Sequence, residues 1–280
     1  MRSDWNRPET YSLPGEGEKR IMLRLSYDGS FFHGWQAQGN APSVQGTLSQ
    51  VLTEILKKET VVYGSGRTDA GVHALSQVCH FDTSSSIAAE KYRVILNTKL
   101  PKSIRVLSSQ EAPEGFHARF STMSREYWYL IKAAEDMLPW DDGRIAMFKE
   151  LPPFDLLQSY ASLIVGTHDF TTFASARDQS LSKVRDIYLS QWDIIYDVFG
   201  TQILRYRTAG NAFLYHQVRS MVGTMVYASL SGEACEAFRT RLESRSREMA
   251  LRTASPAGLY LADVSYDPEK YQWFEEQYGR

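Results

Sequence analysis

The residues with the strongest chemical character stand close together in the short run 64–74, GSGRTDAGVHA. Glycines flank an arginine and an aspartate there, which is typical of a tight loop whose backbone approaches another group closely. Arg67 and Asp69 are two positions apart, so both side chains point to the same side where the chain is extended. A guanidinium beside a carboxylate favours the ionised carboxylate, which suits a nucleophile or a general base. The same spacing also fits an ion pair that only stabilises the loop.

The sequence disfavours several other kinds of site. The glycine-rich run lacks the Gly-Lys-Ser/Thr ending of a phosphate-binding P-loop. The two cysteines, Cys79 and Cys235, are isolated, and His73, His168 and His216 do not have the spacing of metal ligands. We therefore expect no metal site and no disulfide framework. Unpaired thiols favour a reducing, cytoplasmic setting.

The composition is that of a folded globular protein, with 280 residues, 43% hydrophobic residues and a net charge of -2. No apolar run is long enough to span a membrane, and the first 20 residues do not have the pattern of a signal peptide. The net charge argues against a polyanionic partner, but the charges are segregated. Residues 91–132 carry eight basic and three acidic side chains, and residues 239–252 carry five and two. Because the local field governs the approach of a polyanion, a nucleic-acid partner stays open.

The elements that position the glycine-rich run come from the first half of the chain. Alternating apolar residues predict a strand over 21–27 that ends at Asp28-Gly29. Ser43 is a plausible N-cap for a helix, because apolar residues recur at helical spacing over 44–56. Short strands near 61–62 and over 75–81 enclose the run. A helix from about 87 to 99 and a strand over 104–107 follow.

The second half mixes strands and helices in a similar way. A strand is expected over 121–132 with Tyr127 on its apolar face, and a hairpin joins 184–196 to 201–207. Helices are expected at 154–164, from about 215, and at 234–249, followed by a strand over 259–266. On the helix from 215, His216, Arg219 and Gly223 form a polar or small stripe suited to facing a ligand groove.

Hairpins among the helices favour an α+β fold over a doubly wound parallel sheet. We predict a flexible N-terminal extension over 1–19, an N-terminal α+β half over 20–112 with the carboxylate loop, and a C-terminal α+β half over 113–280. The acid- and proline-rich stretch from about 135 to 153 has the composition of a linker.

The run 66–74, GRTDAGVHA, resembles the signature loop of the TruA-type tRNA pseudouridine synthases. Further segments resemble that family in the same order along the chain, over about 20–267. These are 27–38 (YDGSFFHGWQAQ), 43–46 (SVQG), 96–101 (LNTKLP), 116–129 (FHARFSTMSREYWY), 166–170 (GTHDF), 210–223 (GNAFLYHQVRSMVG) and 256–261 (PAGLYL). The departures are Lys183, where a small hydroxyl residue is usual, and Leu251, where glycine is usual.

This resemblance implies two RRM-like, ferredoxin-like halves with antiparallel or mixed sheets that flank a central catalytic cleft. It implies a homodimer that isomerises uridine to pseudouridine at positions 38–40 of the tRNA anticodon arm without a cofactor. Asp69 then takes the place of the catalytic aspartate, with Arg67 beside it. Tyr127 matches the tyrosine that stacks on the flipped uracil, and Arg219 matches an arginine near the nucleophile.

The covalent route of Asp69 stays open, because attack on the sugar, attack on the uracil and assistance of glycosidic cleavage all need a carboxylate. Three other functions also stay open. They are pseudouridylation at another RNA position, catalytically silent tRNA binding or RNA folding on the same scaffold, and small-molecule hydrolysis with Asp69 as the nucleophile. Taken alone, Tyr127 would also fit a core position on its strand and Arg219 a solvated helix position.

Overall fold

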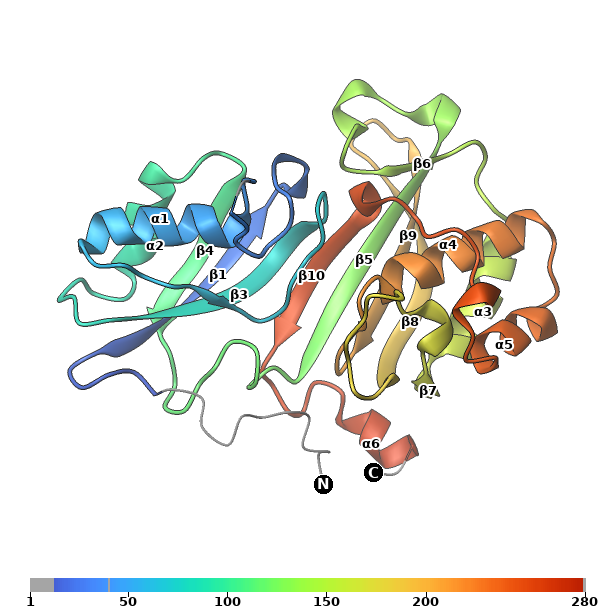
Figure 1. Cartoon of the computed structure of the whole chain (residues 1–280). Helices are drawn as coiled ribbons and strands as arrows, with labels where there is room; N and C mark the ends of the chain where they lie inside the picture. The colour runs from blue at the N-terminus through green and yellow to red at the C-terminus, as the bar shows by residue number, and fades with distance from the viewer. Residues whose placement is uncertain (1–12, 40, 279–280) are drawn as a thin grey trace. The chain divides into compact units, whose positions relative to one another are not determined.

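The computed structural model describes residues 13–39 and 41–278, which form two compact units. Within the described residues, the first unit comprises the chain up to 123 together with 261–267, and the second comprises 124–260 and 268–278. Each unit combines strands and helices, which confirms the predicted α+β class (Figure 1). The limits predicted for the two halves, 20–112 and 113–280, stay a prediction. Residues 1–12 of the expected extension lie outside the described residues.

The first unit is built on the strand order β4-β1-β3, in which both neighbouring pairs are antiparallel. Helices α1 and α2 lie against this sheet (Figure 1). Its elements are β1 (Lys19–Tyr27), η1 (Gly29–Phe31), α1 (Val44–Leu56), β2 (Tyr63–Gly64), β3 (His73–Thr83), α2 (Lys91–Lys99) and β4 (Ile104–Glu111).

The sequence patterns explain these elements. Alternate residues of β1 are buried, as the period of two predicts, and β1 pairs with β3 from Lys19 opposite Thr83 to Tyr27 opposite Ala74. A β-bulge between Leu25 and Tyr27 shifts this register just before the strand ends. The Ser43 side chain accepts a hydrogen bond from the backbone N–H of Gly46, which confirms it as the N-cap of α1.

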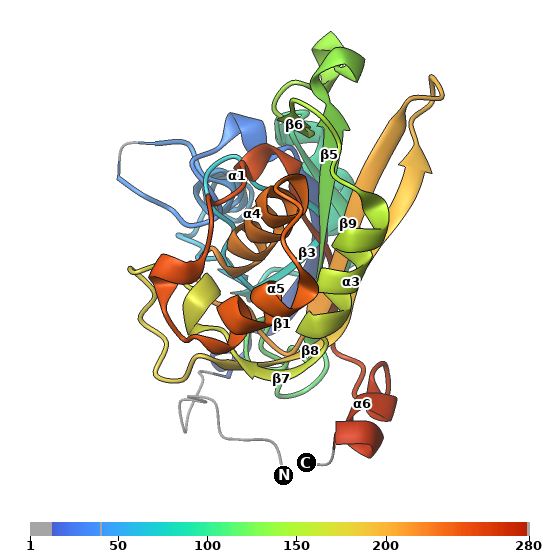
Figure 2. The ribbon, with the colours of Figure 1, turned by 90° about the vertical axis from the view of Figure 1, so that its right-hand side faces the viewer.

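The second unit has the strand order β5-β9-β8-β7, with the short β6 parallel to β5. Helices α3, α4 and α5 gather on the same face of this sheet (Figure 2). Its elements are β5 (Ser124–Ala133), η2 (Ala134–Asp136), η3 (Pro139–Asp141), β6 (Ala146–Phe148), α3 (Phe154–Ile164), β7 (Gly166–Asp169), η4 (Thr171–Phe173), β8 (Val184–Tyr196), β9 (Gln202–Gly210), α4 (Gln217–Leu230), α5 (Cys235–Glu243), η5 (Arg247–Met249), η6 (Pro256–Gly258) and α6 (Gln272–Tyr278).

Strand β10 (Leu259–Ser265) returns the chain to the first unit. The backbone N–H of Met123 donates to the Ser265 carbonyl at 2.9 Å, and Arg24 pairs with Asp263 at 2.9 Å. These contacts anchor residues 261–267 in the first unit, where β10 is the neighbour of β3. Within the described parts of the chain, none of the helices combines the length and apolar character of a membrane span.

Two sequence-based expectations were wrong. The stretch 135–153 is not a linker, because its strand β6 pairs with β5 and its Asp141 forms a buried ion pair with Lys132. The helix expected over 234–249 ends at Glu243, and a short 3-10 helix follows. On the stripe of α4, Gly223 packs against the segment that follows α5: a Cβ at Gly223 would lie 2.0 Å from the Arg252 carbonyl oxygen.

Candidate active site

Asp69 lies in the loop between β2 and β3, residues 65–72, which we call the carboxylate loop. Hydrogen bonds hold this loop at the backbone. The Ser65 N–H donates to the Val78 carbonyl at 2.8 Å, and the Gln77 side-chain amide donates to the Gly66 carbonyl at 2.9 Å. Because Gln77 is fully buried, its amide is a fixed support for the start of the loop.

The centre of the carboxylate loop packs on the segment that follows β1. The Trp35 N–H donates to the Thr68 carbonyl at 3.0 Å, and the Tyr27 hydroxyl is 2.8 Å from the Thr68 hydroxyl. Two glycines permit this approach. A Cβ at Gly34 would lie 2.6 Å from the Thr68 carbonyl oxygen, and one at Gly29 would lie 2.0 Å from that of Val72. The backbones of the two segments therefore meet without intervening side chains.

This packing fixes the backbone of Asp69 between two anchored neighbours. The Asp69 carbonyl accepts a hydrogen bond from the Val72 N–H at 3.1 Å, in a turn whose Gly71 has a φ of 77°. The adjacent Thr68 is buried, whereas Asp69 is half-buried. The loop thus presents a carboxylate at a defined position on a rigid backbone, as catalysis by a carboxylate requires.

Arg67 is exposed on the same loop and lies in the field of a second arginine. Burial lowers the pKa of the Arg119 guanidinium, and the positive charge of Arg67 lowers it further. Arg119 also lies over the ring of Phe120, 5.7 Å from the ring centroid. The first unit therefore places two cations near one another, where they attract an anion.

Tyr127 belongs to the second unit and lies on β5 opposite Thr208 of β9. Only 8% of it is exposed, and its ring packs edge-to-face on Phe213, with centroids 5.1 Å apart and an interplanar angle of 81°. An edge-to-face contact fixes the plane of the Tyr127 ring. Sequence reasoning did not single out Phe213 as its support, although it stands in the matching segment 210–214.

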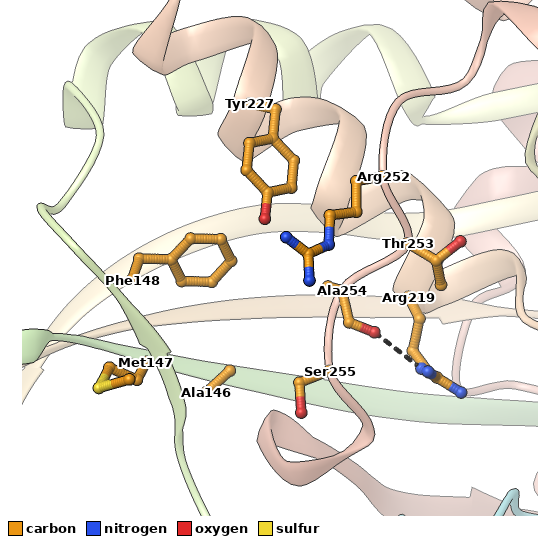
Figure 3. A pocket seen from close by; sticks show the side chains of 9 residues that line it. All are labelled: Ala146, Met147, Phe148, Arg219, Tyr227, Arg252, Thr253, Ala254 and Ser255. Carbon is orange, nitrogen blue, oxygen red and sulfur yellow. Dashed lines mark hydrogen bonds between the residues drawn. The ribbon is translucent and has the colours of Figure 1, made fainter.

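Arg219 also belongs to the second unit, near the start of α4. Its Nε donates to the Ala254 carbonyl at 2.9 Å (Figure 3), and the Ala254 N–H donates to the Arg219 carbonyl at 3.1 Å. This reciprocal pair fixes both the side chain and the backbone of Arg219. Asp69 and Arg67 thus lie on the first unit and Tyr127 and Arg219 on the second, and their meeting in one site stays a prediction.

Comparisons with known proteins agree with the resemblance seen in the sequence. The family model described as tRNA pseudouridine synthase matches residues 25–121 and 160–267. The chain is 38% identical over 250 residues to tRNA pseudouridine synthase A of Bacillus pumilus, which covers 89% of this chain and 99% of the relative. It is 39% identical over 259 residues to the protein of that name from Anoxybacillus flavithermus, with 89% and 99% covered. It is 36% identical over 250 residues to that of Borreliella burgdorferi, with 89% and 100% covered.

A two-unit α+β fold with a rigidly held carboxylate loop, in a chain matched over most of its length, defines an RNA-modifying isomerase. The chain belongs to the tRNA pseudouridine synthase family. Its substrate is therefore tRNA, and its reaction converts uridine to pseudouridine. Of the four residues chosen from the sequence, Arg67, Asp69 and Arg219 lie within the matched ranges, and Tyr127 lies between them.

Proposed function

We propose that this enzyme modifies uridines at positions 38–40 of the tRNA anticodon arm, with Asp69 as the nucleophile. The three relatives carry the name tRNA pseudouridine synthase A and align over at least 89% of this chain. The observation that carries the proposal is the half-buried Asp69 on a loop anchored at Ser65, Gly66 and Thr68.

The reaction rearranges bonds within one nucleotide. The bond from uracil N1 to the ribose C1′ breaks, the uracil turns, and its C5 bonds to C1′. C5 then loses its proton and N1 ends with one, so no oxidant or group donor is needed. A carboxylate at Asp69 supports this through attack on the sugar, attack on the uracil, or assistance of glycosidic cleavage.

Tyr127 and the two arginines complete the proposed site. The Tyr127 ring, held edge-to-face by Phe213, stacks on the flipped uracil, and its hydroxyl helps to remove the C5 proton. The exposed Arg67 holds the RNA backbone open. We expect Arg219, whose guanidinium is fixed by the Ala254 carbonyl, to act beside the nucleophile.

Release of tritium from C5-labelled uridine in unmodified tRNA tests this proposal. The Asp69→Ala variant should release none while it still binds tRNA. Glu111→Gln is the matched control, because it neutralises an exposed acid of the same unit at the end of β4. Turnover by Asp69→Ala would remove Asp69 from the role of nucleophile.

Tyr127 is tested in the same assay. The Tyr127→Phe variant keeps a stacking ring and loses only the hydroxyl, whereas Tyr127→Leu loses both. We expect Tyr127→Leu to be the slower of the two. Full activity of Tyr127→Phe would exclude an essential hydroxyl, and full activity of Tyr127→Leu would exclude stacking.

The rival functions give different results. A catalytically silent tRNA-binding protein would bind tRNA and release no tritium, and a small-molecule hydrolase would do neither. Mapping pseudouridine in tRNA from a deletion strain identifies the positions that this enzyme modifies. The proposed homodimer is tested by light scattering of the purified protein, and the proposed cytoplasmic location by cell fractionation.

A further inference from the structure

A cavity of about 250 Å³ opens in the second unit between β6, α4 and the segment 251–255. Figure 3 shows the Arg252 guanidinium on the same side of the cavity as the Tyr227 hydroxyl, with the Phe148 ring beyond that hydroxyl. The lining also contains small and hydroxyl side chains but no carboxylate; the full set is Ala146, Met147, Phe148, Arg219, Tyr227, Arg252, Thr253, Ala254 and Ser255. The cavity therefore favours an anionic ligand.

The backbone around Arg252 is held on both sides. The Leu251 N–H donates to the Thr224 hydroxyl at 3.1 Å, and the Tyr129 hydroxyl donates to the Ser255 carbonyl at 2.7 Å. Gly223 of α4 lets the Arg252 carbonyl lie against the helix. The Cα of Arg252 is thus fixed before any ligand arrives. On binding, the protein therefore has to order only the Arg252 side chain, which keeps its entropic cost small.

The Arg252 side chain itself is not used by the fold. It is exposed, and no hydrogen bond or ion pair joins its guanidinium to another residue in the described part of the chain. The Tyr227 hydroxyl likewise has no hydrogen-bond partner among the described residues, while its ring packs on Phe148 with centroids 5.9 Å apart. Two kinds of donor therefore converge on one cavity without an acceptor from the protein.

We propose that this cavity binds a backbone phosphate of the tRNA substrate through Arg252 and Tyr227. A planar guanidinium donates two parallel hydrogen bonds to a phosphate, and a tyrosine hydroxyl adds a third. The cavity also holds part of the adjoining ribose, against Phe148 and Ala146. Arg219, which also lines the cavity and is bound to the Ala254 carbonyl, adds positive potential. This inference rests on the proposed function, since the ligand is its RNA substrate.

Binding of unmodified tRNA transcript, measured at several salt concentrations, tests the proposal. We expect Arg252→Ala to weaken binding by about three- to tenfold and to reduce the slope of log K against log salt by about one. Arg239→Ala is the matched control, because it removes an arginine of α5 that does not line the cavity. Unchanged affinity and slope in Arg252→Ala would overturn the proposal.

A second measurement locates the phosphate. Anticodon-arm RNAs are made with one neutral methylphosphonate linkage at each position in turn. The linkage that replaces the contacted phosphate should weaken binding of the RNA to the wild type and leave its binding to Arg252→Ala unchanged. If none of the linkages gives this pair of results, the proposal is wrong. Tyr227→Phe should show a partial loss at the same linkage. Tritium release by the wild type is scored separately, so its absence would refute the proposed function and not the binding site.

Discussion

Replacement of Gly34 by alanine tests whether backbone packing positions the catalytic carboxylate. Gly34 has a φ of 94°, which costs an alanine about 1–2 kcal/mol. The new Cβ would lie 2.6 Å from the Thr68 carbonyl oxygen, and relief of such overpacking costs a further ~1–3 kcal/mol. At about 2–4 °C for each kcal/mol, we expect the unfolding midpoint to fall by roughly 5–15 °C.

The same variant should be slow as well as less stable. To restore ordinary contact at 3.4 Å, the Thr68 carbonyl must retreat by about 0.8 Å, the difference between 3.4 and 2.6 Å, and Asp69 is the next residue. A displacement of this size in a catalytic group costs about a hundredfold in rate. Tritium release at saturating tRNA, measured well below the unfolding midpoint, checks this.

Gly115→Ala is the control for backbone strain. Gly115 has a φ of 69° in the same unit, but a Cβ there has no neighbour within 4 Å. It should lose about 1–2 kcal/mol and keep its rate. If Gly34→Ala matched Gly115→Ala in both stability and rate, the reasoning that Gly34 positions the carboxylate loop would be wrong.

Two further predictions concern stability. Burial, followed by the charges of Arg20 and His117, lowers the pKa of His80 to about 3, so the folded state keeps His80 neutral while the unfolded state protonates near pH 6.5. His80 therefore contributes to the free energy of unfolding above pH 6.5, and this contribution is lost as the pH falls towards 3, with about 2 kcal/mol gone by pH 5. Urea unfolding of His80→Gln should lack that loss. If His80→Gln kept the pH dependence of the wild type, the prediction would be wrong. Lys132→Met leaves the buried Asp141 carboxylate without its cation, so it should lower the thermal unfolding midpoint by several degrees. Lys149→Met, at an exposed position, should leave the midpoint unchanged. Equal midpoints for the two variants would show that the ion pair does not stabilise the stretch 135–153.

Local patterns predicted the elements that carry the site. The alternation in β1, the Ser43 cap of α1 and the glycine-rich turn before β3 each depend on neighbours within a few positions. The carboxylate loop could therefore be placed between two strands from the sequence. Its docking on Gly34 could not, because that contact depends on how two loops meet.

The errors share the same cause. The acids and prolines of the stretch 135–153 have the composition of a linker, but Asp141 and Asp197 both reach the buried Lys132 from different parts of the second unit. Such a cluster is a three-body contact that no single window of sequence contains. Arg252 was missed for a related reason: its freedom from partners shows only once the rest of the segment is seen bound to α4 and β5.

The charge distribution makes the total charge a poor guide to the partner of this protein. Several acids are committed to internal ion pairs, among them Asp82 with Arg20 at 2.7 Å and Glu233 with Arg241 at 2.7 Å. These pairs cancel locally and contribute little field at a distance. Arg67 and Arg252, by contrast, have no acidic partner among the described residues. The field near these two arginines is therefore locally positive, although the whole chain has a net charge of -2. This combination favours specific placement of the RNA over strong non-specific binding.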